Sequence, residues 1–195
     1  MPSPRPHPSR QRPLSALLKA SLQHARSLAI VGIGSALRGD DIAGLLVLRE
    51  LRAAMARSRP KTIHSEASER VRLFDGGTAP ENLTGEIVRF QPSHILLVDA
   101  ADLGLKPGAA TLIEPEAVAG MSFSTHVLPL SILADYLKRA LPCCIMILGI
   151  QPGPTGFSTT HSREISQAAR RLARIILHAA PLREAKRQRT KGNRP

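Results

Sequence analysis

The architecture of this chain follows from the stretch Ser27-Leu28-Ala29-Ile30-Val31-Gly32-Ile33-Gly34. It joins a compact apolar run to two glycines, which is typical of a buried parallel strand that enters a tight turn. A loop up to Asp40 follows, and Asp40 is suited to cap a helix. Beyond it, apolar residues recur at helical intervals, at Ile42, Leu45, Leu46, Leu48 and Leu51. The stretch therefore predicts a strand, a loop and a helix.

Further elements alternate along the rest of the chain. We predict a short docking helix at 14–25, strands at 71–74, 94–98, 110–113 and 144–150, and helices at 128–140 and 162–178. Strands that alternate with helices are typical of a parallel sheet covered by helices. The prediction is an α/β fold, a three-layer sandwich with a mostly parallel central sheet of about five strands.

Length and composition indicate one domain. A chain of 195 residues that is 43% hydrophobic can bury one ordinary core. We expect a disordered leader rich in Pro and Arg at 1–13, a single α/β domain at 14–180 and a basic tail at 181–195.

The compartment is predicted from what the sequence lacks. No apolar run approaches the roughly 20 residues of a membrane span, and the basic N-terminus has no signal-peptide core. Cys143 and Cys144 are adjacent, without metal-ligand spacing, and are predicted to be buried thiols. We therefore expect a cytoplasmic protein without a membrane partner.

The net charge of +12 belongs to the two ends of the chain. The first 27 residues hold five basic and no acidic residues, and the last 15 hold six basic residues and one acidic residue. Such tails are usually solvated, and 3% aromatic residues leave little to stack on bases. Nucleic acid is therefore a minor alternative partner, one that the tails alone would bind.

Two nucleotide-binding motifs fail in the first loop. A dinucleotide fingerprint needs a third glycine where this chain has Leu37. Gly34 and Gly39 have P-loop spacing, but Asp40 and Asp41 replace the lysine and hydroxyl residue that should follow. Two carboxylates there repel a triphosphate, so no nucleotide cofactor is expected.

A cation suits these carboxylates better. Asp41 begins a predicted helix, Asp99 ends an apolar strand, and His126 lies in a loop before a helix. The carboxyl ends of parallel strands meet at one edge, and two carboxylates with an imidazole suit Ni, Zn or Mn. The alternatives are helix capping for Asp40 and Asp41, a turn or capping role for Asp99 and an ordinary loop histidine at His126.

Five ordered motifs resemble the hydrogenase maturation endopeptidases. They lie at 32–41, 74–82, 97–104, 122–126 and 148–152. The Thr-Ala-Pro-Glu-Asn and Gly-Ile-Gln-Pro stretches most resemble the branch that processes hydrogenase 3, the formate-hydrogenlyase type. One departure is Ser35, where the family usually has Asn; serine can still hydrogen-bond to the turn.

The resemblance implies a function and a site. It implies a cytoplasmic aspartyl-type endopeptidase that removes the C-terminal extension of a NiFe-hydrogenase large-subunit precursor. Asp41, Asp99 and His126 are then metal ligands, and the nickel is that of the precursor. The general base is a carboxylate near Asp41 or Asp75, or Asp75 instead shapes the cleft. The main alternative is a non-catalytic, nickel-sensing chaperone for hydrogenase assembly.

Overall fold

A five-stranded sheet forms the centre of the computed structural model, which describes residues 12–58, 70–113 and 130–180. The strand order is β2-β1-β3-β5-β4, and every neighbouring pair is parallel except β4 with β5. The strands are β1 Leu28–Ile33, β2 Val71–Gly77, β3 His94–Ala100, β4 Ala110–Ile113 and β5 Cys144–Ile150. The predicted mostly parallel sheet of about five strands is confirmed.

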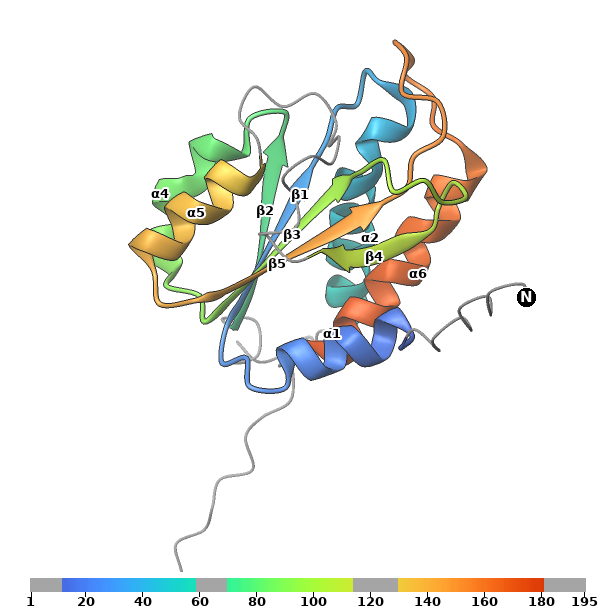
Figure 1. Ribbon diagram of the computed structural model, residues 1–195. Helices are drawn as coiled ribbons and strands as arrows, with labels where there is room; N and C mark the ends of the chain where they lie inside the picture. The colour runs from blue at the N-terminus through green and yellow to red at the C-terminus, as the bar shows by residue number, and fades with distance from the viewer. Residues whose placement is uncertain (1–11, 59–69, 114–129, 181–195) are drawn as a thin grey trace, which may run out of the picture.

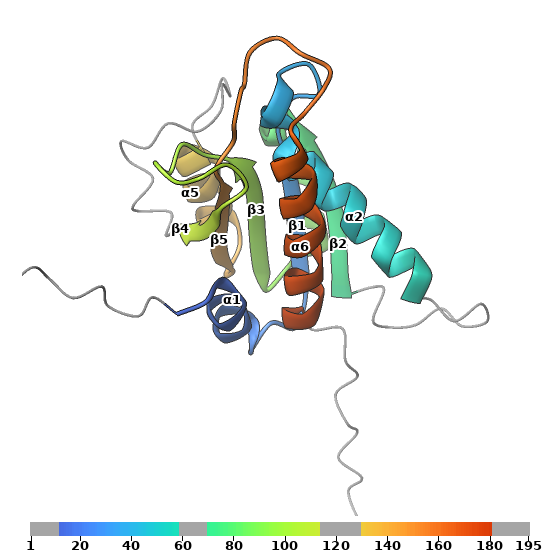
Figure 2. The ribbon, with the colours of Figure 1, turned by 90° about the vertical axis from the view of Figure 1, so that its right-hand side faces the viewer.

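Helices cover both faces of this sheet (Figures 1 and 2). The helical elements are α1 Leu14–Leu22, η1 Gly39–Ile42, α2 Ala43–Ser58, η2 Pro80–Leu83, α4 Thr84–Phe90, α5 Leu130–Ala140 and α6 Arg163–Ala179. Helices α2 and α6 lie on one face, and α4 and α5 on the other. Each face therefore has its own apolar core.

Alternation along β1 divides its side chains between the two cores. Leu28 and Ile30 pack with α2 and α6, whereas Ala29, Val31 and Ile33 pack with α4 and α5. All six residues of β1 are buried. An uninterrupted apolar run is thus the pattern that a strand covered on both faces requires.

The predicted docking helix is confirmed as α1. Leu18 and Leu22 are buried in the core of the α2 and α6 face, and α1 contacts α6 and β4. Helix α4 was not predicted, because its seven residues include only Ile87 as a fully buried side chain. So short an amphipathic segment gives almost no periodic signal.

One prediction about the thiols is wrong. Cys144 is exposed and Cys143 is only half-buried, because they lie where the chain enters β5, before its buried residues begin. Burial and the neighbouring Cys144 raise the pKa of the Cys143 thiol.

Two further predictions concern the ends of the chain and membrane-spanning segments. The predicted tail at 181–195 and all but Arg12 and Pro13 of the predicted leader lie outside the described residues. Each helix within those ranges is too short or too polar to cross a lipid bilayer.

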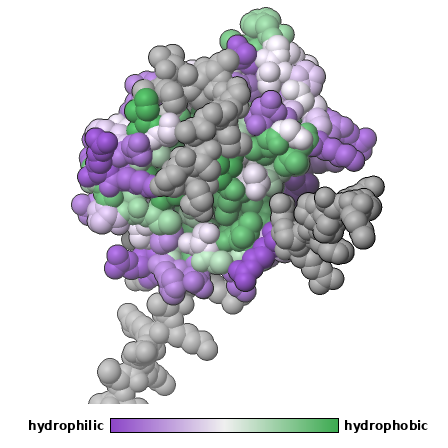
Figure 3. Space-filling model, viewed as in Figure 1, coloured by the Kyte–Doolittle hydropathy of each residue, from purple (hydrophilic) through white to green (hydrophobic). Residues whose placement is uncertain are grey.

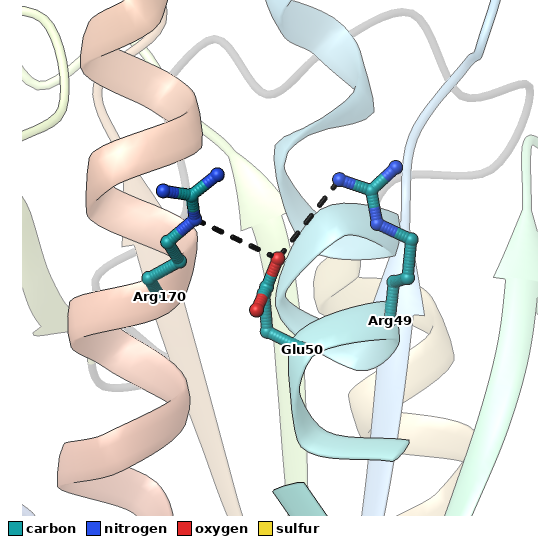
Figure 4. Close-up of polar contacts among 3 residues, drawn as sticks. All are labelled: Arg49, Glu50 and Arg170. Atoms are coloured by element: carbon teal, nitrogen blue, oxygen red, sulfur yellow. Dashed lines mark ion pairs between the residues drawn. The ribbon is translucent and has the colours of Figure 1, made fainter. Parts of the chain in front are cut away.

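Glu50 links the two helices of one face (Figure 4). One of its carboxylate oxygens lies 3.9 Å from nitrogens of both Arg49 on α2 and Arg170 on α6. These pairs are long and both arginines are largely exposed, so they contribute little beside the apolar contacts between α2 and α6.

Candidate active site at the carboxyl edge

The carboxyl ends of β2, β1, β3 and β5 meet at one edge of the sheet, because these four strands are mutually parallel. Asp99 is the sixth residue of β3 and pairs in register with Gly149 of β5. Asp75 pairs with Gly32 on the other side of the sheet. The edge therefore collects the polar segments that follow the strands, as in other open α/β sheets.

Two glycines bring the η1 turn down onto this edge. A methyl group at position 44 would overlap the carbonyl oxygens of Val98 and Ile33, so the first turn of α2 contacts the strand backbones directly. Gly34 has a φ of +143° and lies against the carbonyl of Asp41. Turn η1 consequently packs on β3, the strand that carries Asp99.

Ser35 keeps the turn closed, as its hydroxyl chemistry predicted. Its Oγ accepts a hydrogen bond from the Leu37 backbone at 3.3 Å, and its backbone N–H donates to the Asp41 carbonyl at 3.3 Å. The loop tolerates serine at this position because a short polar side chain can accept a backbone hydrogen bond two residues on.

Asp41 is the most unusual group at the edge. Its side chain is fully buried, and neither carboxylate oxygen has a hydrogen-bond partner within the described residues. A buried carboxylate without a partner costs several kcal/mol in general, so native structures pair such groups or bind cations with them. The two carboxylate oxygens of Asp41 are chemically suited to bind a metal ion. They make no hydrogen bond to the start of the helix within the described residues, so the alternative role in helix capping is wrong for Asp41.

Asp99 is also fully buried, and the backbone of the next residue helps to orient its carboxylate. One carboxylate oxygen, Oδ1, accepts a hydrogen bond of 2.7 Å from the backbone N–H of Ala100. That bond agrees with the turn role considered for Asp99, and the carboxylate still lies on the strand against which the Asp41 turn packs.

Asp40 does not cap the helix either; it fastens a distant loop. Its Oδ1 accepts from the Ser162 N–H at 2.6 Å, and its Oδ2 accepts from the Ser162 hydroxyl at 2.7 Å and the Gly153 N–H at 2.8 Å. Ser162 Oγ in turn caps α6 by accepting from Ile165 N–H. Sequence analysis missed this role because the partners are 113 and 122 residues away.

Gln151 organises the loop after β3, which is a second role that sequence analysis missed. Its Oε1 accepts from the Leu103 and Leu105 backbones at 2.7 and 3.2 Å, and its Nε2 donates to Asp102 at 3.4 Å. The Gly-Ile-Gln-Pro motif that contains it was the available signal. Gln151 and Asp40 together join the loops after β1, β3 and β5.

Asp75 lies at the same edge but faces solvent. About half of its side chain is exposed, and its Oδ2 lies 3.6 Å from Arg52 Nη1. Arg52 is nine residues into α2, about 13 Å along the helix from its first residue. Asp75 is therefore in an environment different from that of the buried Asp41 and Asp99.

The third predicted ligand, His126, lies outside the described residues. Within those residues, no three His, Cys, Asp or Glu side chains gather as a metal site. The structure thus brings together the elements of Asp41 and Asp99. Two buried carboxylates at an edge can bind a cation and can accept a proton from water.

Comparison with known proteins points to one family. Residues 59–179 match the family model of the hydrogenase maturation proteases. The chain is 36% identical over 137 residues to the hydrogenase 3 maturation protease of Escherichia coli K12. The aligned residues cover 70% of this chain and 80% of that protein.

Solved structures agree with that match. The crystal structure of the NiFe-hydrogenase maturation protease HycI from Thermococcus kodakarensis is 32% identical, with a TM-score of 0.71 over 84% of this chain and 97% of that one. The solution structure of the endopeptidase HycI from Escherichia coli is 34% identical, with a TM-score of 0.63 over 76% and 87%.

Proposed function

The chain belongs to the hydrogenase maturation protease family, and from this premise we propose that it removes the C-terminal extension of a NiFe-hydrogenase large-subunit precursor in a nickel-dependent reaction. As a member of that family it is a peptidase. The nickel belongs to the precursor, which carries it to the enzyme, and no nucleotide takes part.

Asp41 is the observation that carries this proposal. Its carboxylate is buried beside β3 with both oxygens lacking a hydrogen-bond partner among the described residues. An arriving cation would offset the cost of that burial. Asp41 and Asp99, with His126 from the segment that precedes α5 in the sequence, are the proposed ligands, and the nickel of the precursor would polarise the scissile carbonyl as a Lewis acid.

The chain's own residues then orient the peptide and take up a proton. The ligands bring the peptide bond nearest the nickel over the carboxyl edge. Asp41 is the proposed general base, because its buried carboxylate has no hydrogen-bond partner among the described residues and could accept a proton from water. Because hydrolysis needs only one such base, Asp75 is free for a second task.

Asp75 is proposed to position the extension rather than to take the proton. Its half-exposed carboxylate is already engaged by Arg52 at 3.6 Å. An extended peptide that crosses the end of β2 would meet this carboxylate and Gly76-Gly77, the last residues of that strand. We expect Asp75→Asn to raise KM for the precursor while kcat changes little.

The test compares purified precursor with and without nickel. The protein is mixed with either form, and the released C-terminal fragment is followed by mass spectrometry. Cleavage of the nickel-loaded precursor alone is expected. Equal cleavage of both forms would contradict nickel dependence, and cleavage of neither would favour the nickel-sensing chaperone.

Matched variants identify the site. Asp41→Asn, Asp99→Asn and His126→Ala should each abolish processing of the nickel-loaded precursor. Asp102→Asn is the control, because Asp102 lies three residues after Asp99 at the same edge but is exposed. An Asp99→Asn variant that still processes the precursor would remove that residue from the proposed site.

A further inference from the structure

Large apolar side chains are exposed at the same edge as the site. Within the described ranges, five large hydrophobic residues are exposed: Leu37, Leu105, Ile132, Tyr136 and Phe157. Leu37 follows β1, Leu105 follows β3 and Phe157 follows β5, so these three lie on loops at the carboxyl edge. We call them the apolar rim.

Phe157 is the most exposed member of the rim. Its exposure is 87%, against 53% for Leu37 and 50% for Leu105. The chain has only four phenylalanines, one tyrosine and no tryptophan. An aromatic side chain that is almost fully exposed to solvent is therefore unusual in this protein. Figure 3 shows hydrophobic surface at the tip of the loop after β5, which Figure 1 draws in orange.

Backbone hydrogen bonds join the loops of Leu37 and Phe157. Ser158 N–H donates to the Leu37 carbonyl at 2.9 Å, and Gly39 N–H donates to the Ser158 carbonyl at 2.9 Å. Both views of the ribbon show the two loops side by side (Figures 1 and 2). The Asp40 carboxylate fastens the same pair of loops through Gly153 and Ser162.

This construction ties the rim to the site. Asp40 holds the loop of Phe157, and the next residue, Asp41, is the proposed nickel ligand and base. The Leu105 loop is joined to the segment after β5 through Gln151. A partner that covers the rim is therefore held at a fixed distance from Asp41.

We propose that the apolar rim of Leu37, Leu105 and Phe157 docks the folded body of the large-subunit precursor, next to the extension that is cut. This inference rests on the proposed function. Exposed apolar and aromatic side chains are typical of protein interfaces, and these three lie on loops at the edge that carries the site. A second copy seated there would cover the edge that carries Asp41, whereas the substrate must approach that edge to be cleaved.

The experiment measures precursor binding separately from cleavage. Biolayer interferometry gives Kd for nickel-loaded precursor, and the mass assay gives KM and kcat, for the full-length protein and its variants. Phe157→Ser and Leu37→Ser should each weaken binding about tenfold or more and raise KM in parallel, with kcat at saturation unchanged. Phe157→Leu, which stays apolar, should retain most of the affinity.

Tyr136→Ser is the matched control, because Tyr136 is an aromatic residue that is 54% exposed in the middle of α5. Its Kd and KM should equal those of the wild type. Since Phe157 packs against little, the melting temperature of Phe157→Ser should stay within about 1 °C of the wild type, which separates docking from folding.

Each other outcome is decisive. Rim variants that bind and cleave as the wild type does overturn the docking surface and leave the proposed function standing. A wild-type dimer in sedimentation velocity that Phe157→Ser dissociates, with Kd for precursor unchanged, assigns the rim to a second copy and overturns the inference. A wild type that neither binds nor cleaves precursor overturns the proposed function and the inference with it. Binding that depends on the rim, without cleavage, supports the docking surface and contradicts the proposed cleavage of the precursor.

Discussion

Two adjacent aspartates in this chain are equally buried but have opposite hydrogen-bonding environments. Asp40 accepts three hydrogen bonds from Gly153 and Ser162, whereas the Asp41 carboxylate has no hydrogen-bond partner in the described part of the chain. The first stabilises the fold through long-range contacts. The second is an energetic cost that the fold carries, which is typical of groups kept for function.

Asp40→Ala should destabilise the protein. The substitution leaves the Gly153 N–H, the Ser162 N–H and the Ser162 hydroxyl without their acceptor. We expect a loss of about 2–4 kcal/mol in the free energy of unfolding, measured by urea denaturation. Asp135→Ala, at an exposed position on α5, is the control and should change it by less than about 0.5 kcal/mol. Equal effects would show that the Asp40 bonds are not what holds the loop.

Asp41→Asn should have the opposite effect on stability. Removing a buried charge without a hydrogen-bond partner is expected to raise the free energy of unfolding by about 1–3 kcal/mol, measured in EDTA so that no metal contributes. The same variant should lose processing of the precursor. A variant less stable than the wild type would mean that the carboxylate is already satisfied in solution.

At the scale of elements, close contact between α2 and the strand ends positions the site. The helix begins one residue after η1, and Gly44 lets its first turn rest on the carbonyls of Val98 and Ile33. The elements that carry Asp41 and Asp99 therefore meet at the same edge of the sheet. A small shift of α2 would separate Asp41 from the strand of Asp99.

Gly44→Ala should therefore be severe, and Gly85→Ala should not. A methyl group at 44 meets two rigid backbone carbonyls, whereas at 85 on α4 only the flexible Arg89 guanidinium lies within 4 Å. We expect Gly44→Ala to cost about 3 kcal/mol or more and Gly85→Ala to leave the stability unchanged or raise it by up to about 1 kcal/mol. Thermal melts of the two variants side by side test the difference; similar melts would show that α2 can shift without cost.

At the scale of the whole molecule, the two edges of the sheet carry different polar groups. The carboxyl edge holds the buried carboxylates, and the amino edge closes the core through Ser27, Ser93 and His94. Ser27 and Ser93 exchange hydrogen bonds of 2.9 Å, and Ser93 Oγ lies 3.0 Å from His94 Nδ1. Acid sensitivity of the fold is thus expected at the edge remote from the site.

His94 should make the protein less stable in mild acid. Burial and the nearby His24 lower the pKa of the His94 imidazole from its ordinary value of 6.5. Above that pH the ring is neutral in both states; as the pH falls below it, the unfolded chain takes up a proton before the folded one does, and stability is lost. Urea denaturation at pH 7.5 and 5.0 should show a smaller acid loss for His94→Gln than for the wild type. The same loss in both would assign the acid sensitivity elsewhere.

Local pattern was enough to predict most of the fold. Apolar runs such as 27–34 placed β1, β3 and β5, because burial of a strand on both faces imposes a pattern that the chain itself displays. Shorter runs placed the partly exposed edge strands β2 and β4. Apolar spacing likewise placed α1, α2, α5 and α6. The ends of parallel strands also predicted that Asp41 and Asp99 would share an edge, since that follows from topology alone.

Tertiary contacts were needed for what the neighbouring residues do. Asp40 looks like a helix cap in sequence, and only the approach of Gly153 and Ser162 makes it a clamp. The exposure of Phe157 is likewise visible only in the folded chain, where its loop is hydrogen-bonded to the loop of Leu37. Hydrogen bonds between residues more than a hundred positions apart leave no periodic trace in a sequence. The strand edge was therefore predictable, but the division of labour between Asp40 and Asp41 was not.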